Sequence, residues 1–111
     1  MKYLVVATGG PGFAYPEEAL EVLQSTILPT FKELISLEKR KKIIAGGLPV
    51  GERTFVFIAE AKSNDELDQM LRKLPMWGEL DLEVTPLQTF NGRAKQERQA
   101  VKELKKIIKN N

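Results

Sequence analysis

Hydrophobic residues recur along this chain with two different periods, one typical of helices and one typical of strands. From Pro16 onward, apolar side chains return every three or four positions, which predicts a long amphipathic helix with one core-facing stripe. The stripe consists of Leu20, Leu23, Ile27, Phe31, Leu34 and Ile35. Pro29 lies inside this stretch and has no backbone N–H to donate, so we expect a kink or a restart of the helix near Leu28.

Four short segments carry the composition and spacing of β-strands. Residues 3–8 and 43–47 are predicted to be the first two strands, and residues 53–61 the third. In the third strand both faces are apolar, which predicts that both are covered. The two faces are Thr54, Val56 and Ile58 on one side and Phe55, Phe57 and Ala59 on the other. Residues 80–85 alternate between apolar and polar side chains, as in a strand with two unlike faces.

Two further helices are predicted from capping signals and apolar stripes. Ser63 followed by Glu66 matches a capping box, and the helix that begins there is expected to end before Pro75. Residues 94–109 form the last predicted helix, which is strongly charged. Its narrow apolar stripe consists of Ala100, Val101, Leu104, Ile107 and Ile108.

These elements follow the order β-α-β-β-α-β, with one more helix at the end. This is the split βαβ order, so we predict a single α+β domain of ferredoxin-like fold over residues 1–92 and a basic amphipathic helix over residues 93–111. Such a sheet has helices on one face only, and an apolar second face of several hundred Å² is an association surface. We therefore expect a homodimer or a larger homo-oligomer. The terminal helix is expected to lie either across a partner subunit or back on its own domain.

The chain has neither cysteine nor histidine, and this restricts its chemistry. Disulfides, thiolate nucleophiles and cysteine metal sites are excluded, and a reducing cytoplasm is the expected compartment. Without histidine, a Ser-His-Asp triad or a typical zinc site is excluded too, so we expect no metal. Any proton transfer must use Asp, Glu, Lys or Tyr. No apolar segment is long enough to predict a membrane span.

The net charge of +2 is distributed unevenly along the chain. Residues 93–111 hold seven basic and two acidic side chains, whereas residues 1–92 hold ten basic and thirteen acidic ones. Basic side chains of this kind can bind nucleic acid or acidic lipid. In the terminal helix, however, they are dispersed around an apolar stripe with no aromatic residues for stacking on bases. We therefore predict a solvated helix face, with neither nucleic acid nor membrane as a partner.

Residues 63–87 resemble the C-terminal half of the muconolactone isomerases. In both, a short helix ends in Leu-Pro, here Leu74-Pro75, and an apolar and an aromatic residue follow, here Met76-Trp77. A strand then reads Leu80-Asp81-Leu82-Glu83-Val84. The resemblance implies a dimeric α+β barrel that is often assembled further. It also implies a pocket for a small lactone or aromatic-pathway intermediate and a proton shift between carbons without a cofactor.

The chain departs from this family at two places. Ile43–Gly47 stands where the family usually carries tryptophans and a histidine, and Phe90-Asn91 stands where it tends to place His-Pro. Three hypotheses therefore remain open. The chain is a cofactor-free isomerase, a non-catalytic oligomeric binding or scaffold module whose sheet interface is filled by residues such as Phe55 and Phe57, or a cofactor-free monooxygenase.

Candidate site residues follow from side-chain chemistry. A carboxylate beside apolar strand neighbours can act as a base toward a carbon acid, and a tyrosine can move a proton as well. We therefore name Glu60, Glu83 and Tyr15 as candidate catalytic residues. The candidate substrate-binding residues are Arg53, Trp77 and Phe13. For the carboxylates the alternative is an interfacial ion pair, and for Trp77 it is packing. The loop of residues 9–12 is interpreted as a turn, because no Lys-Ser or Lys-Thr follows it as a phosphate loop requires.

Overall fold

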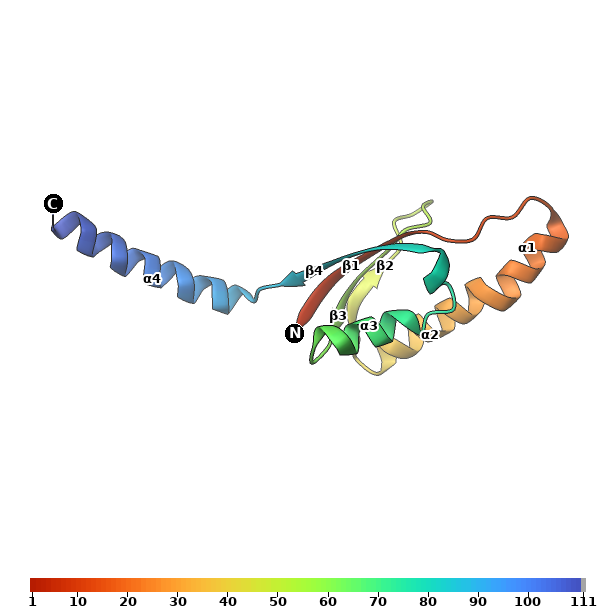
Figure 1. Cartoon of the computed structure of the whole chain (residues 1–111), viewed down its shortest axis with the longest axis horizontal. Helices are drawn as coiled ribbons and strands as arrows, with labels where there is room; N and C mark the ends of the chain where they lie inside the picture. The colour runs from red at the N-terminus through yellow and green to blue at the C-terminus, as the bar shows by residue number, and fades with distance from the viewer. Residues whose placement is uncertain (111) are drawn as a thin grey trace.

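A computed structural model describes residues 1–110 of the chain as one four-stranded antiparallel sheet with helices (Figure 1). The order of the strands across the sheet is β2-β3-β1-β4. The elements are β1 Lys2–Gly9, α1 Pro16–Val22, η1 Leu23–Ile27, α2 Leu28–Lys39, β2 Ile43–Gly47, β3 Phe55–Glu60, α3 Asn64–Arg72, η2 Trp77–Glu79, β4 Leu80–Leu87 and α4 Phe90–Lys109. This confirms the predicted α+β fold of ferredoxin-like βαββαβ order with an extra C-terminal helix.

The sheet has one covered face and one open face. Helices α2 and α3 lie on the same side of the strands (Figure 1). Val5 and its cross-strand partner Phe57 are buried on this covered face. Val6 and its partner Val56 point the other way and are only half-buried. The expectation that both faces of the third strand are covered therefore holds for one face only within residues 1–110.

The long first helix is interrupted as the proline predicted. Leu23–Ile27 forms a π-helical turn, in which the Leu28 N–H donates to the carbonyl of Leu23, five residues back. Pro29 follows at the start of α2, where a missing N–H is tolerated. A π turn adds one residue to a single turn, so the helix restarts without a break in its path. As a result α1 projects beyond the sheet at one end of the molecule (Figure 1).

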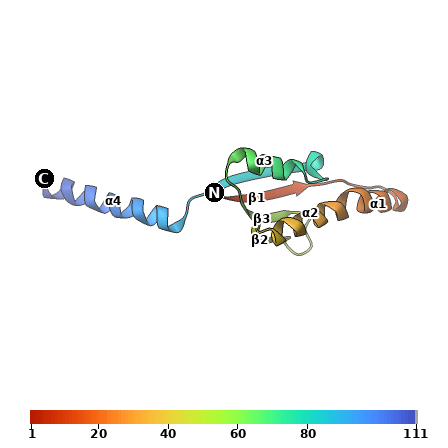
Figure 2. The same cartoon turned by 90° about the horizontal axis from the view of Figure 1, so that it is seen from below.

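The last helix leaves the domain instead of packing on it. It begins at Phe90, four residues before the predicted start, because the Thr89 hydroxyl accepts from the Gly92 N–H at 2.9 Å and caps it. None of its described residues is buried. The chain is consequently 75 Å long, with α4 at one end and α1 at the other (Figures 1 and 2). Among the described helices, none has an apolar stretch of the length a bilayer crossing requires.

Candidate functional site

Two neighbouring cavities lie between the first helix and the covered face of the sheet. The first, with a volume of about 180 Å³, lies between α2 and strands β2 and β3. The second, of about 170 Å³, lies between the helix and the loop that follows β1. Phe31, Leu48 and Phe55 line both cavities. The Phe31 and Phe55 rings meet edge to face with centroids 5.5 Å apart, so this aromatic pair separates the two cavities.

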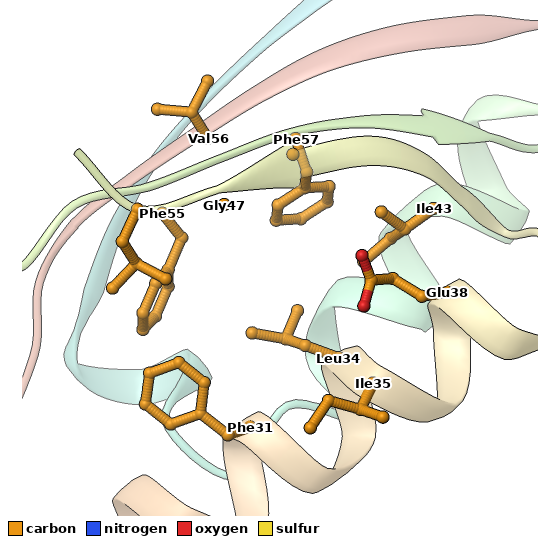
Figure 3. A pocket seen from close by; sticks show the side chains of 11 residues that line it. Phe31, Leu34, Ile35, Glu38, Ile43, Gly47, Phe55, Val56 and Phe57 are labelled. Carbon is orange, nitrogen blue, oxygen red and sulfur yellow. The ribbon is translucent and has the colours of Figure 1, made fainter. Parts of the chain in front are cut away.

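The first cavity is apolar. Phe55 and Phe57 point from β3 toward the helix, and Phe31 and Leu34 point back from α2 (Figure 3). Glu38 is its one ionisable lining residue, and this side chain is exposed at the edge of the cavity. Hydrophobic contact is therefore the main interaction that this cavity offers a ligand.

A glycine keeps the edge strand β2 against this cavity. Gly46 has φ of 153° and lies opposite Phe57 in the β2–β3 register. A Cβ atom at Gly46 would lie 2.4 Å from the Val56 carbonyl oxygen and 2.5 Å from the Phe57 Cβ. Any other residue here would push β2 away from β3, so Gly46 fixes the wall of the cavity.

The second cavity combines apolar walls with a cation. Its lining residues are Gly9, Gly10, Pro11, Phe13, Ile27, Phe31, Leu48, Glu52, Arg53, Phe55 and Met76. The guanidinium carbon of Arg53 lies 5.8 Å from the centroid of the Phe13 ring, a cation–π distance. Both side chains are exposed, so they stand at the mouth of the cavity. A guanidinium beside an aromatic ring suits a flat ligand that carries a carboxylate or an acidic hydroxyl.

The loop that forms this mouth is held by its backbone. The Gly10 N–H donates to the Glu79 carbonyl at 3.0 Å, and Gly10 has φ of 107°, a conformation that favours glycine. The hydrogen bond ties the loop after β1 to the segment before β4. Phe13 is thereby placed on the same side of the cavity as Arg53, which comes from the loop before β3.

Behind the cavities lies a buried hydroxyl that the sequence analysis did not identify. Thr30 is fully buried; its Oγ1 donates to the Thr26 carbonyl at 2.8 Å and accepts from the Met76 N–H at 3.0 Å. These bonds join α2 to the segment that carries Met76, a lining residue of the second cavity. The signal was present in the sequence, since Thr30 occupies a stripe position three residues after Ile27.

Two of the six predicted site residues come together at the cavities, and these are Arg53 and Phe13. Arg53 lies in the loop before β3 and not on the strand, because the strand begins at Phe55. Trp77 lies outside both cavities, 36% exposed, with the Arg72 guanidinium 4.6 Å from its ring centroid. Tyr15 is exposed at the start of α1 and also lies outside them. The roles named for Trp77 and Tyr15 stay predictions.

The two predicted catalytic carboxylates lie on the open face of the sheet. Glu83 is exposed opposite Val6, and Glu60 stands opposite Lys2 with Oε1 3.4 Å from the amino group of Met1. The cavities are on the covered face, so neither carboxylate reaches them within one chain. Their catalytic role stays a prediction, and the interfacial ion pair remains open beside it.

The sheet interface differs from the one expected for a scaffold module. That hypothesis assigned Phe55 and Phe57 to the association surface. Both are buried under the helices instead, because the residues in register with them, Ala7 and Val5, face the core. The open face presents aliphatic side chains in their place: Leu4, Val6, Val56 and Ile58.

One resolved change of acidity lies away from the cavities. Lys42 Nζ donates to Glu66 Oε1 at 3.0 Å, and this hydrogen bond lowers the pKa of the Glu66 carboxyl, helped by the Lys62 N–H at 3.1 Å. The pair ties the turn between α2 and β2 to α3. Within residues 1–110 no cluster of three or more side chains has the composition of a metal site.

Comparison with known proteins agrees with this arrangement. The family model described as muconolactone delta-isomerase matches residues 1–93. A crystal structure of muconolactone isomerase superimposes with a TM-score of 0.65 at 19% identity, covering 80% of this chain and 90% of that one. The 5-chloro-2-hydroxyhydroquinone dehydrochlorinase of Burkholderia phenoliruptrix AC1100, solved with 2,5-dihydroxybenzoquinone, gives 0.58 at 23% identity, covering 82% and 97%. No curated protein matches the chain. The family match stops inside the first turn of α4, so most of that helix lies outside it.

Proposed function

The chain belongs to the muconolactone delta-isomerase family, and we propose that it binds a small, flat, anionic molecule in the two cavities beside Arg53. The observation that carries this proposal is a guanidinium at the mouth of a space whose other lining side chains, apart from the exposed Glu52, are apolar. The ring of such a ligand would lie against Phe13 and Phe55, and its carboxylate or acidic hydroxyl would pair with Arg53. A lactone acid, a muconate-like diacid and a hydroxylated aromatic all meet this description.

The reaction we propose is a proton shift without a cofactor. A base removes a proton from the carbon next to a carbonyl, the resulting enolate is stabilised by the Arg53 cation, and the proton returns to another carbon. Two carboxylates border the cavities, Glu38 on the first and Glu52 on the second, and both are exposed. Among the described residues, these two are the carboxylates that line the cavities. Glu60 and Glu83 would require a second subunit to approach a ligand.

The non-catalytic binding module is the second candidate, and one observation favours it. Both carboxylates at the cavities are in contact with solvent, whereas a base for carbon acids works best when it is desolvated. The same cavities would then hold a ligand without changing it. A cofactor-free monooxygenase would need an electron-rich aromatic ligand in the same place.

We also propose that the open face of the sheet pairs with that of a second chain. Leu4, Val6, Val56 and Ile58 form a contiguous half-buried patch on β1 and β3, with no helix above it among the described residues. Covering the patch removes apolar surface from water. The expected partner is thus a second copy of the chain. We further propose that neither nucleic acid nor membrane is a partner and that the compartment is the cytoplasm.

Binding is tested by a thermal-shift screen against lactones, muconate-like diacids and hydroxylated aromatics. A ligand at a hundred times its dissociation constant should add about 2.7 kcal/mol of stability. Arg53→Met should abolish the shift, and Arg72→Met is the matched control because Arg72 also stacks on an aromatic ring, but outside the cavities. A shift that survives Arg53→Met, or is lost equally in both variants, would contradict the proposed site.

Catalysis is tested separately, with any ligand that binds. Incubation in D₂O followed by NMR should show deuterium entering the carbon next to the carbonyl, more slowly in Glu52→Gln or Glu38→Gln. Binding without exchange in the unmodified protein would exclude the isomerase and favour the binding module.

A further inference from the structure

Helix α4 carries an apolar stripe that nothing covers in the described chain. The helix has 20 residues, about 30 Å of length at 1.5 Å per residue. Its stripe includes Val101, Leu104, Ile107 and Ile108, and these side chains are 50–73% exposed. Lysines flank the stripe at positions 102, 105, 106 and 109, against a single acidic residue, Glu103, in the same stretch. Such a helix gains stability when another apolar surface covers the stripe.

A second uncovered stripe lies at the opposite end of the molecule, on the first helix. Leu20 is 57% and Leu28 59% exposed, and Leu23 and Ile35 extend the stripe along α1 and α2. Leu28, Phe31 and Ile35 also border a shallow groove on this helix. The stripe begins beside three carboxylates, those of Glu17, Glu18 and Glu21, and α1 holds no basic residue.

The two stripes are complementary in charge. Three acidic residues of α1 face no basic partner: within residues 1–110, none of Glu17, Glu18 and Glu21 forms an ion pair. The four lysines of the last turns of α4 are equally unpaired over the same residues. An antiparallel arrangement places the carboxylates of α1 beside the lysines of α4. It also places the positive N-terminal end of α1 beside the negative C-terminal end of α4.

The two stripes of one chain cannot meet. Only Gln88 and Thr89 separate β4 from α4. Helices α4 and α1 point away from the sheet in opposite directions along the 75 Å long axis of the molecule (Figures 1 and 2). A two-fold axis across the long direction of the molecule brings the α4 end of one chain to the α1 end of the other. It forms two equivalent contacts at once.

We propose that α4 docks antiparallel on the α1–α2 helix of a second copy of this chain, in a reciprocal exchange. Ile108 then lies near Leu20, Val101 near Leu28 and Ala94 near Ile35. Successive residues of this set are seven positions apart on α4. On the first helix they are eight and then seven apart, because the π turn between Leu20 and Leu28 adds one residue. This contact shares Phe31 and Ile35 with the lining of the first cavity, but it does not require a ligand there. It uses residues outside the family match, so it distinguishes this chain from a domain that ends at residue 93.

The absence of cysteine makes disulfide mapping a direct test. The full-length variants Leu20→Cys and Ile108→Cys are mixed and allowed to oxidise at a concentration where the protein is oligomeric. A mixed disulfide should form at least tenfold faster than between Lys39→Cys and Ile108→Cys. That second pair is the matched control, since position 39 approaches position 108 only if the helices run parallel. Faster cross-linking in the control, or between two Ile108→Cys chains, would overturn the proposal.

A charge-exchange experiment tests the same contact without cysteines. Replacing Lys102, Lys105, Lys106 and Lys109 by Glu should weaken self-association about tenfold, because like charges then face one another. Replacing Glu17, Glu18 and Glu21 by Lys in the same chain should restore it, as sedimentation equilibrium would measure. If the glutamate-to-lysine changes do not restore the self-association that the lysine-to-glutamate changes removed, the proposal is overturned. A full-length protein that stays monomeric and co-sediments with vesicles containing phosphatidylserine would also overturn it, and would assign α4 to a membrane surface.

Discussion

The two faces of the sheet are built from alternate residues of the same strands, yet they have different properties. Val5 is fully buried on the covered face, and Val6, its neighbour, is half-buried on the open one. The covered face holds the core, both cavities and Arg53 at their mouth. The open face holds the predicted catalytic carboxylates and an aliphatic patch. The helices, not the strand composition, therefore decide which residues of this sheet can meet a ligand.

Removing the same side-chain atoms from each face should give the largest difference in stability between the two faces. Val5→Ala should lower the free energy of unfolding by about 2–3 kcal/mol, because it removes two buried methyl groups and leaves a cavity. Val6→Ala should cost less than about 1 kcal/mol in the dissociated chain. Urea denaturation at low protein concentration measures both. Equal losses would contradict the assignment of the faces.

The buried hydroxyl of Thr30 gives the next largest effect. Thr30→Val leaves the Met76 N–H without an acceptor, so the free energy of unfolding should fall by about 1–3 kcal/mol. Thr85→Val, an exposed change on the open face, is the matched control and should be within about 0.5 kcal/mol of the unmodified protein. Chemical denaturation separates the two. If Thr30→Val leaves the free energy of unfolding unchanged, the hydrogen bond to Met76 does not contribute to stability.

On the open face the expected effect is on association, not on stability. Ile58→Lys places a charge in the centre of the patch and should shift the protein toward the monomer, whereas Lys2→Ala at the exposed margin should not. Light scattering after size exclusion gives the mass of each variant. An unchanged oligomer in Ile58→Lys would place the interface elsewhere.

The smallest effect concerns the Lys42–Glu66 pair. The pair lowers the pKa of Glu66 in the folded state, so its contribution is present above the unfolded pKa of about 4.3 and is lost as the pH falls through the folded value. Glu66→Gln should therefore be less stable than the unmodified protein at pH 7 and equal to it at low pH. Thermal unfolding from pH 7 to pH 3 measures this difference. A difference that does not change with pH would rule out the ion pair as its cause.

Most of the fold could be predicted because its signals are local. Strand β2 occupies the predicted residues 43–47, and Ser63 caps α3 by accepting from the Glu66 N–H at 3.1 Å. The capping box is modified, however, because the Glu66 carboxylate accepts from the Lys62 N–H and not from that of Ser63. The order of the elements along the chain and the spacing of apolar residues were sufficient to predict the architecture.

The site was harder to predict because it depends on contacts between distant segments. Arg53 and Phe13 meet across the mouth of a cavity although 40 positions separate them, and both were named from their chemistry alone. Alternation showed that Glu60 and Ile58 share a face, but not that this face lies opposite the cavities. Trp77, the single tryptophan of the chain, lines neither cavity, and its ring instead lies beside the Arg72 guanidinium.

The proposed ligand site lies on the covered face of the sheet. The most direct measurement is methyl NMR of the labelled full-length protein, titrated with the strongest hit from the stability screen. We predict shift changes at Leu34, Leu48 and Met76, which line the cavities, and none at Leu4, Val6 or Ile58 in an unchanged oligomer. Changes confined to the second group would place the ligand between subunits, near Glu60 and Glu83, and would contradict the account.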